Sequence, residues 1–272
     1  MSELLKLLKL LDAKKYKTMM TIKKIKAPRE LRAEDVPQLM LAHQVKYEKV
    51  ACLNWPEAFP VHPQMEVAMA HTGDNLLLHY RVEEDCIRAA AKQDGGRVWE
   101  DSCCEIFLQA PTPITQHSTP NIQHPSPNKN NPSSPKEEAG DESPYFNLEC
   151  NCAGTLLIAK GPDRHDRQPA PEDVMKSVGR WSSLTSEATP QPNGRYVLPL
   201  ENGDFHWHMA LVVPATALFG SGIDNFSGLT LRGNIYKCGD CLREPHFLSL
   251  FPIETPQPDF HRPEFFQELR FE

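Results

Sequence analysis

The feature that most constrains this chain is a series of short segments in which apolar and polar residues alternate. The segment MEVAMAHTGDNLLLHYRV is the clearest case, because the turn residues HTGDN separate two alternating arms. Val67 and Met69 share one side of the first arm, and Leu76, Leu78 and Tyr80 belong to the second arm. Successive side chains of a strand point to opposite faces, so this pattern predicts a β-hairpin with one buried face.

Similar segments recur along the rest of the chain. They read YFNLECNCAGTLLIAKG, WSSLT, RYVLPL, FHWHMALVVP, LTLRGNIYKCG and PHFLSLFPI. Helical spacing is confined to a short piece near Ala215–Phe219 and to the N-terminal segment, where Leu4, Leu7, Leu8 and Leu11 lie among lysines. Many short strands with few helices predict an all-β sandwich that carries a short N-terminal helix.

Composition divides the chain into an extension and one domain. Residues 1–30 contain nine Lys or Arg and three acidic residues, which predicts a basic N-terminal extension. Its amphipathic helix could instead contact a membrane surface or a partner. Residues 31–272 are predicted to form a single β-sandwich domain, and residues 110–144, with eight prolines, are predicted to be a long disordered insertion in it.

The overall charge excludes some classes of partner. The formal net charge is -7 although the first 30 residues are basic, and phosphate binding requires clustered positive charge, so we expect no nucleic-acid partner. No apolar run approaches the roughly 20 residues of a membrane-spanning helix, so no transmembrane segment is expected. The N-terminus lacks the apolar core and cleavage site of a signal peptide, which favours a cytoplasmic protein whose eight cysteines stay reduced.

The common catalytic motifs are absent from the sequence. It contains no G-x-S-x-G, no G-x-x-x-x-G-K-[ST] and no G-x-G-x-x-G after a strand. Asp101 and Glu105 are four residues apart, which is roughly 13 Å along a strand at about 3.3 Å per residue. Glycosidase carboxyl pairs lie about 5–9.5 Å apart, so this pair does not fit hydrolysis on a regular strand. No catalytic residue is assigned.

The cysteines could hold zinc, although their spacing does not require it. Cys238-Gly-Asp-Cys241 is a single C-x-x-C, and a structural zinc site usually needs a second pair or two histidines. His246, Cys150 and Cys152 could supply further ligands, but nothing in the sequence brings them together. Reduced and mostly buried cysteines are the favoured interpretation, and the metal ligands stay unassigned.

The segment VWEDSCCEIFL, residues 98–108, contains a candidate binding face. Alternation places one set of side chains on one face (Trp99, Asp101, Cys103, Glu105 and Phe107) and another set towards a core (Cys104, Ile106 and Leu108). The adjacent Cys103 and Cys104 therefore cannot bind one metal together. An aromatic ring beside carboxylates suits a sugar, because the ring packs on the C–H face and the carboxylates accept hydroxyl hydrogen bonds. The alternative is a buried structural tryptophan with exposed acids.

Several segments together resemble the carbohydrate-binding module family 9-like domains, and they look most like the small stand-alone members rather than the modules attached to xylanases. They are LNWPEAFP, HTGDNLLLHYRVEED, VWEDSCCEIFL, YFNLECNCAGTLL, GNIYKCGD, PHFLSLFPI and PDFHRPEFFQELRFE, in order from about Ala51 to Glu272. The resemblance implies a two-sheet antiparallel jelly-roll-like β-sandwich, binding of a mono- or oligosaccharide, and structural calcium. It matches Trp99 to a sandwiching tryptophan and Glu105 to a sugar-binding glutamate.

The same resemblance marks two departures. Glu149 stands where related sequences have an arginine, and Leu250 stands where they have the second tryptophan, for which Phe251 or Tyr236 could substitute. In addition, Trp99 and Glu105 are about 20 Å apart on a regular strand. They can share one monosaccharide only if Trp99 lies in the loop before the strand and folds back.

Arg232, Asn234 and Tyr236 alternate in LTLRGNIYKCG and so share a face, where they could line the sugar site or form a buried network. Gly233 between them allows close approach of another chain or a ligand. The predicted function is non-catalytic sugar binding on Trp99 in a sandwich cleft, linked to carbohydrate catabolism. The alternatives are a hydrolase-associated accessory role or O-glycosyl hydrolysis, and a protein-interaction or metal-stabilised module that has lost the sugar site.

Overall fold

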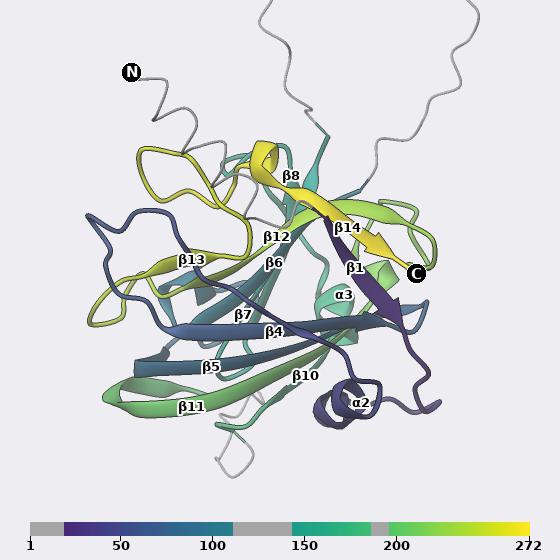
Figure 1. The fold of residues 1–272 in the computed structure, drawn as a ribbon, viewed down its shortest axis with the longest axis horizontal. Helices are drawn as coiled ribbons and strands as arrows, with labels where there is room; N and C mark the ends of the chain where they lie inside the picture. The colour runs from purple at the N-terminus through teal and green to yellow at the C-terminus, as the bar shows by residue number, and fades with distance from the viewer. Residues whose placement is uncertain (1–18, 111–142, 186–195) are drawn as a thin grey trace, which may run out of the picture.

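The computed structural model describes residues 19–110, 143–185 and 196–272 (Figure 1). The expected N-terminal helix and almost all of the expected insertion at 110–144 lie outside these residues. Within them, strands of up to 17 residues dominate and form two sheets packed face to face, as the alternating pattern predicts. The predicted all-β sandwich is confirmed.

The first sheet, called here the β6 sheet, carries the candidate site. Its strands in order are β14 (Gln267–Phe271), β12 (Thr230–Cys238), β6 (Cys103–Gln109), β7 (Tyr145–Asn151), β8 (Leu156–Gly161) and β9 (Gln168–Pro169). Two short strands extend it beside β12, namely β13 (Phe247–Ser249) and β3 (Cys52–Leu53). Pairing within this sheet is antiparallel from β14 to β9.

The second sheet, called the β5 sheet, lies beneath it in Figure 1. Its strands are β10 (Gly179–Ser182), β11 (Leu198–Pro214), β5 (Asn75–Ala89), β4 (Gln64–His71) and β2 (Tyr47–Lys49). The hairpin prediction is confirmed, since Val67 pairs with Tyr80 and Met69 with Leu78. The segments RYVLPL and FHWHMALVVP, which look separate in the sequence, contribute to one strand, β11, whose register against β5 shifts twice.

One strand joins the two sheets in parallel. The first part of β1 (Met19–Lys24) pairs with β14, and Lys23 and Lys24 pair with β4. Its Met20 and Ile22 are buried in the core between the sheets. The sequence predicts that residues 19–24 belong to the basic extension, but they form a strand of the sandwich. The prediction misses this strand because so short a segment, rich in lysine, shows too little alternation.

The core between the sheets follows from the alternation. Cys104, Ile106 and Leu108 of β6 are buried there, as predicted, together with Leu78 and Tyr80 of β5. The residues between them on β6, namely Cys103, Glu105 and Phe107, consequently face outwards from the sandwich. This outer face is covered by a second cluster that includes Trp55, Tyr236, Phe260 and Phe266.

Helices are few and short. The 3-10 turn η1 (Ala33–Asp35) leads into α2 (Val36–Ala42), whose Val36 and Met40 cover the outer face of the β5 sheet. The remaining pieces are α3 (Glu172–Ser177) and the 3-10 turns η2 (Val98–Glu100), η3 (Ala215–Ala217) and η4 (Pro263–Phe265). The turn η3 confirms the helical piece expected near Ala215–Phe219. No helix among the described residues is long and apolar enough to cross a membrane.

A buried histidine lies on the outer face of the β5 sheet. His79 contacts the hydroxyl of Tyr47 through Nδ1 and lies 3.1 Å from Nδ1 of His208 through Nε2. Burial, and then the charges of His208 and Arg81, lower the pKa of His79 to about 3. This histidine is therefore neutral in the folded protein at neutral pH.

Candidate functional site

A pocket of about 470 Å³ lies on the outer face of the β6 sheet and is called here the Trp99 pocket. Its aromatic lining residues are Trp99, Phe107, Phe247 and Phe260. Its polar lining residues are Glu105, Asn147, Glu149, Arg164, Arg167, Asp240, Asp259 and His261. Small-molecule sites typically occupy about 300–1,000 Å³, so the pocket has the size of a ligand site with both stacking and hydrogen-bonding walls.

Trp99 does not lie on the strand. It belongs to η2, four residues before β6 begins at Cys103, and its side chain is half-buried. Asp240 donates its backbone N–H to the Trp99 carbonyl at 3.1 Å, and Cys241 does the same to Glu100 at 3.1 Å, so the loop after β12 holds the turn. The chain therefore folds back, and Trp99 and Glu105 line the same pocket.

Asp101 is a structural residue and not a pocket residue. Alternation placed it on the face of Glu105, but the chain reaches a regular strand only at Cys103. Its carboxylate is fully buried and accepts hydrogen bonds from Arg88, Asn151 and the backbone N–H groups of Ala90 and Ala91. These bonds fasten the turn that carries Trp99 to β7 and to the end of β5.

Glu105 and Glu149 lie directly opposite each other on β6 and β7. Both are buried, and both line the pocket. Burial, together with the charge of Glu149, raises the pKa of Glu105 well above its usual value. Burial also raises the pKa of Glu149 to about 7, although the hydrogen bond from Asn147 acts in the opposite direction and lowers this pKa. At neutral pH the pair therefore carries protons as well as charge and can both donate and accept hydrogen bonds.

Arg167 supplies a guanidinium group that the sequence analysis did not assign to the site. It donates to Asn147 on β7 and to the carbonyls of Tyr145 and Gly161 at 3.1 and 2.9 Å. The loop reaches this position because Asp166 O lies 1.8 Å from where a Cβ on Gly161 would be. Glu149 replaces an arginine expected on β7, and the positive charge comes instead from the loop between β8 and β9.

The aromatic residues facing the same pocket as Trp99 are not the expected ones. Leu250 is packed against the core between the sheets, and Phe251 is buried in that core. Phe247 of β13 and Phe260 of the C-terminal segment line the pocket instead. The sequence signal was the alternation of PHFLSLFPI itself, which puts Phe247 on the face opposite to Leu248.

Tyr236 lies beneath the pocket and does not line it. It pairs with Glu105 on β6, is fully buried, and stacks on Phe260 with ring centroids 4.2 Å apart and planes 8° apart. Its hydroxyl donates to the Phe260 carbonyl at 3.2 Å. Tyr236 therefore supports Phe260 from below.

Arg232 and Asn234 share the face of Tyr236 but are not among the pocket-lining residues. The Arg232 guanidinium donates to the carbonyls of Pro263 and Phe266, both at 3.1 Å. Asn234 donates to the Phe251 carbonyl at 3.0 Å and accepts from its N–H at 3.0 Å. These contacts are structural: Arg232 anchors the segment before β14, and Asn234 anchors the chain just after β13.

The comparisons with known proteins decide the family. The model of carbohydrate-binding family 9 matches residues 34–117 and 136–271, which is most of the chain. This chain belongs to carbohydrate-binding family 9. A proposed carbohydrate-binding protein from Bacteroides uniformis is 34% identical in its crystal structure, with a TM-score of 0.77 over 94% of this chain and 99% of that one.

Two family 9 modules from Caldicellulosiruptor kristjanssonii are more distant. The module solved with glucose is 7% identical, with a TM-score of 0.44 over 93% of this chain and 95% of its own. The one solved with cellotriose is 8% identical, with a TM-score of 0.45 over 93% of both chains. No curated protein matches the chain.

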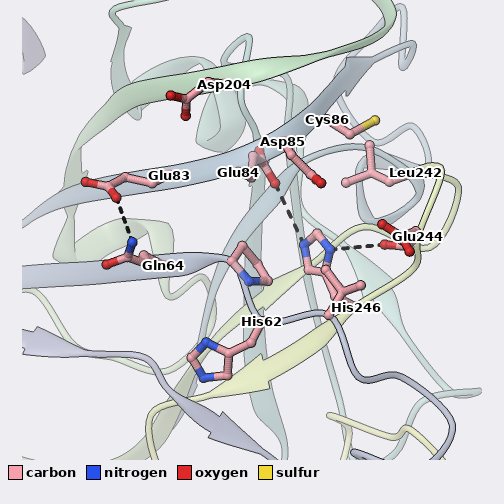
Figure 2. A pocket seen from close by; sticks show the side chains of 12 residues that line it. His62, Gln64, Glu83, Glu84, Asp85, Cys86, Asp204, Leu242, Glu244 and His246 are labelled. Carbon is pink, nitrogen blue, oxygen red and sulfur yellow. Dashed lines mark hydrogen bonds and ion pairs between the residues drawn. The ribbon is translucent and has the colours of Figure 1, made fainter.

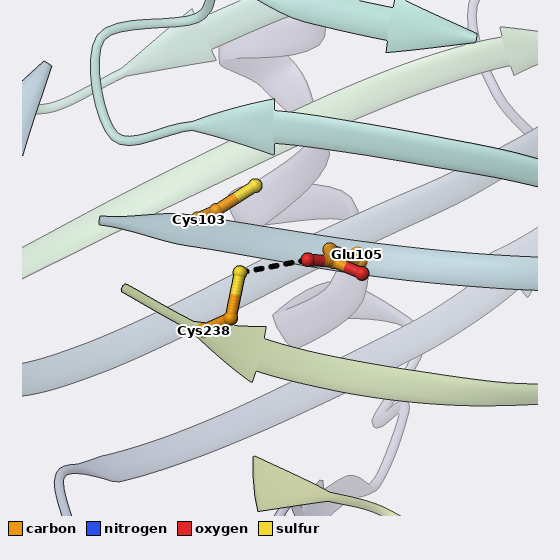
Figure 3. A group of neighbouring side chains, drawn as sticks. All are labelled: Cys103, Glu105 and Cys238. Carbon is orange, nitrogen blue, oxygen red and sulfur yellow. Dashed lines mark hydrogen bonds between the residues drawn. The ribbon is translucent and has the colours of Figure 1, made fainter. Parts of the chain in front are cut away.

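Family 9 implies structural calcium, and we tested the described residues for a fit. Calcium takes six to eight oxygen ligands. The one group of potential metal ligands within the described ranges consists of Cys103, Glu105 and Cys238, shown in Figure 3. Two thiols and one carboxylate do not fit calcium. The zinc ligands considered from the sequence are also separated, because Cys241 is exposed and Cys150 faces the core between the sheets.

A second pocket, of about 310 Å³, is lined by residues of β4, β5 and β11 and of the segment after β12 (Figure 2). Its lining includes five acidic side chains, Glu83, Glu84, Asp85, Asp204 and Glu244, and no Trp, Tyr or Phe. Glu84 forms a buried ion pair with Lys237 at 2.9 Å, and His246 lies between Glu84 and Glu244. Without an aromatic wall, this pocket offers no surface for stacking a sugar ring.

Proposed function

We propose that the Trp99 pocket binds a mono- or oligosaccharide without converting it, in the service of carbohydrate catabolism. The observation that carries the proposal is the joint lining of one pocket by Trp99 and the Glu105–Glu149 pair, in a chain that belongs to carbohydrate-binding family 9. The condition set by the sequence, that Trp99 must fold back before the strand, is met by η2.

The two kinds of lining residue have complementary roles in this proposal. Trp99 offers an indole face to the C–H groups of a sugar ring, and Phe247 and Phe260 add apolar surface to the same pocket. No described residue donates a hydrogen bond to Glu149 Oε2, which is therefore an acceptor for a sugar hydroxyl. A carboxyl that accepts hydroxyl hydrogen bonds makes the pocket selective for a polyol over an apolar ring.

Titration calorimetry with a panel of mono- and oligosaccharides tests this proposal. We expect one sugar class to bind, and we expect Trp99→Ala to weaken it about 10-fold or more, which corresponds to about 1.4 kcal/mol. Glu149→Gln retains an acceptor and a similar shape, so we expect a smaller loss. Trp181→Ala is the matched control, because Trp181 is also half-buried but lies on β10 of the other sheet. Equal affinities of the wild type and Trp99→Ala would remove Trp99 from the site.

Glycoside hydrolysis is a second candidate, favoured by one observation. Glu105 and Glu149 form a cross-strand carboxyl pair beside Trp99, which residue spacing along one strand could not show. A hydrolase needs one protonated acid and one ionised base or nucleophile. Burial raises the pKa of Glu105 well above its usual value and that of Glu149 to about 7, so Glu149 is the member of the pair that ionises first. If the wild-type protein releases reducing sugar from an oligosaccharide and Glu149→Gln does not, that result would favour hydrolysis over binding alone.

A further inference from the structure

Two thiols and one carboxyl group converge at the wall of the Trp99 pocket. Cys103 and Cys238 are directly opposite each other on β6 and β12, and Glu105 lies two residues further along β6 on the same face. Their two sulfur atoms and a carboxylate oxygen all lie within 4.8 Å of one another. In Figure 3, Cys238 and Glu105 point towards each other from adjacent strands, with Cys238 Sγ 2.8 Å from Glu105 Oε1.

The three groups of this cluster are removed from solvent. All three residues are almost fully buried, with 0% to 2% of their surface exposed. Within the part of the chain that the structure describes, no lysine or arginine forms an ion pair with Glu105. Lys237, next to Cys238 in the sequence, faces the opposite side of the sheet and pairs with Glu84, although its charge also acts on Glu105. Buried groups of this kind either keep their protons or, when ionised, are paired with an opposite charge or bound to a metal.

We propose that Cys103, Glu105 and Cys238 form a binding site for a thiophilic divalent cation of the zinc type, with a fourth position open to the Trp99 pocket. The inference goes beyond sugar binding and does not depend on it. Glu105 and Cys238 also line the pocket, so a cation held by all three residues faces it. A water molecule or a ligand hydroxyl would occupy the fourth position, as in zinc sites with three protein ligands.

The dimensions of the cluster agree with tetrahedral coordination. Zinc–sulfur bonds of about 2.3 Å and zinc–oxygen bonds of about 2.0–2.2 Å place tetrahedral ligands roughly 3.6–3.8 Å apart. The present separations, at most 4.8 Å, need side-chain shifts of about 1 Å and no movement of the strands. The contact between Cys238 and Glu105 would open, because the thiol proton that it shares with the carboxylate leaves when sulfur binds the metal.

Charges of both signs surround the cluster, since Arg164 and Arg167 also line the Trp99 pocket. Asp240 and Glu149 both line the same pocket, and the negative charge of each acts on Glu105. Two thiolates select zinc over calcium and magnesium, which take oxygen ligands. On binding, the protons of Cys103 and Cys238, and of Glu105 where it carries one, are released to solvent while the metal–ligand bonds form.

Metal binding can be measured without a sugar. The full chain, stripped with a chelator and kept reduced, is titrated with Zn²⁺ against a chromophoric chelator. We expect one Zn²⁺ per chain. Co²⁺, added to the same wild-type protein, should give the absorption of a thiolate-to-cobalt charge transfer, a readout that needs no substitution.

Three variants then assign the ligands. We expect Cys103→Ser, Cys238→Ser and Glu105→Gln each to weaken Zn²⁺ binding at least about 10-fold, since loss of an outer-sphere partner alone typically costs 10–100-fold. Cys241→Ser is the matched control and should bind as the wild type does, because Cys241 is exposed and outside the cluster.

Two results would overturn the proposal. One is the absence of stoichiometric Zn²⁺ binding together with a cobalt spectrum that lacks the thiolate band. The other is Zn²⁺ binding that survives in the Cys103→Ser/Cys238→Ser protein, provided that its far-ultraviolet circular dichroism matches the wild type. A metal result of either kind leaves the effect of Trp99→Ala on sugar binding unchanged, so the two proposals can fail separately.

Discussion

Asp101→Asn tests whether the turn that carries Trp99 is held by a buried carboxylate. One carboxylate oxygen accepts from Arg88 Nη1 at 2.7 Å and from Ala90 N at 2.9 Å. The other accepts from Ala91 N at 3.0 Å and from Asn151 Nδ2 at 2.9 Å. An asparagine has one oxygen and one NH₂ group, so whichever way it is oriented, two buried donors face another donor.

The neighbouring side chain cannot adapt by turning over. The amide oxygen of Asn151 already accepts from the backbone N–H groups of Ala153 and Thr155, at 3.2 and 2.9 Å, and a flip would break both bonds. Each buried donor left without an acceptor costs about 1–3 kcal/mol, so two of them predict a loss of about 2–6 kcal/mol in the free energy of unfolding. That is a large part of the 5–15 kcal/mol typical of a domain.

Chemical denaturation of the purified chain, followed by tryptophan fluorescence, measures this loss. Glu100→Gln is the control at the adjacent position, because its ion pair with the exposed Arg97 should contribute at most about 1 kcal/mol. The reasoning is refuted if Asp101→Asn unfolds within about 0.5 kcal/mol of the wild type, or if Glu100→Gln loses as much as Asp101→Asn.

Three further predictions concern the rest of the sandwich. Lys237→Met leaves the carboxylate of Glu84 buried without its ion-pair partner and should lower the free energy of unfolding by about 3–5 kcal/mol. The double variant Lys237→Met/Glu84→Gln should recover much of that loss. Additive losses for the two substitutions in denaturation experiments would contradict this prediction. The pKa of His79 is lowered in the folded state, so the unfolded chain binds the extra proton below about pH 6.5, and stability should fall as the pH drops from there towards 3. Between pH 6.5 and 5 the histidine accounts for about 1.6 kcal/mol of that fall, and His79→Gln should lose correspondingly less over the same range; parallel curves would exclude His79 as the cause. Gly233→Ala would place a Cβ 2.4 Å from Phe107 O on the neighbouring strand and should lower the free energy of unfolding by about 1–3 kcal/mol. A melting temperature equal to that of the wild type would contradict this prediction.

Some features of the site could be predicted from local sequence because they depend on local geometry. Alternation along β6 separated Cys104, Ile106 and Leu108 from Cys103 and Glu105, since side chains of a strand alternate whatever surrounds them. The hairpin of β4 and β5 was predicted for the same reason, with its turn marked by glycine and polar residues.

Other features depend on contacts between distant parts of the chain. Alternation gave the wrong face for Asp101, because the regular strand begins only at Cys103. In the turn before it, the hydrogen bonds of Asp101 determine the direction of the side chain. The aromatic lining was misplaced for a similar reason. Leu250 marks the position expected from related sequences, but the face that reaches the pocket is set by how β13 pairs with β12, which brings in Phe247.

The sequence by itself determined the all-β sandwich, its family and the pairing of an aromatic residue with a carboxylate near residues 99–105, because strand alternation and motif order act over a few residues. Only the tertiary structure decided which groups share the pocket. Separate strands and loops supply Glu149, Arg167, Phe247 and Phe260. The sequence around each of these residues does not determine which of the others becomes its neighbour. The same holds for Cys103 and Cys238, 135 positions apart in the sequence, which antiparallel pairing of β6 with β12 sets side by side.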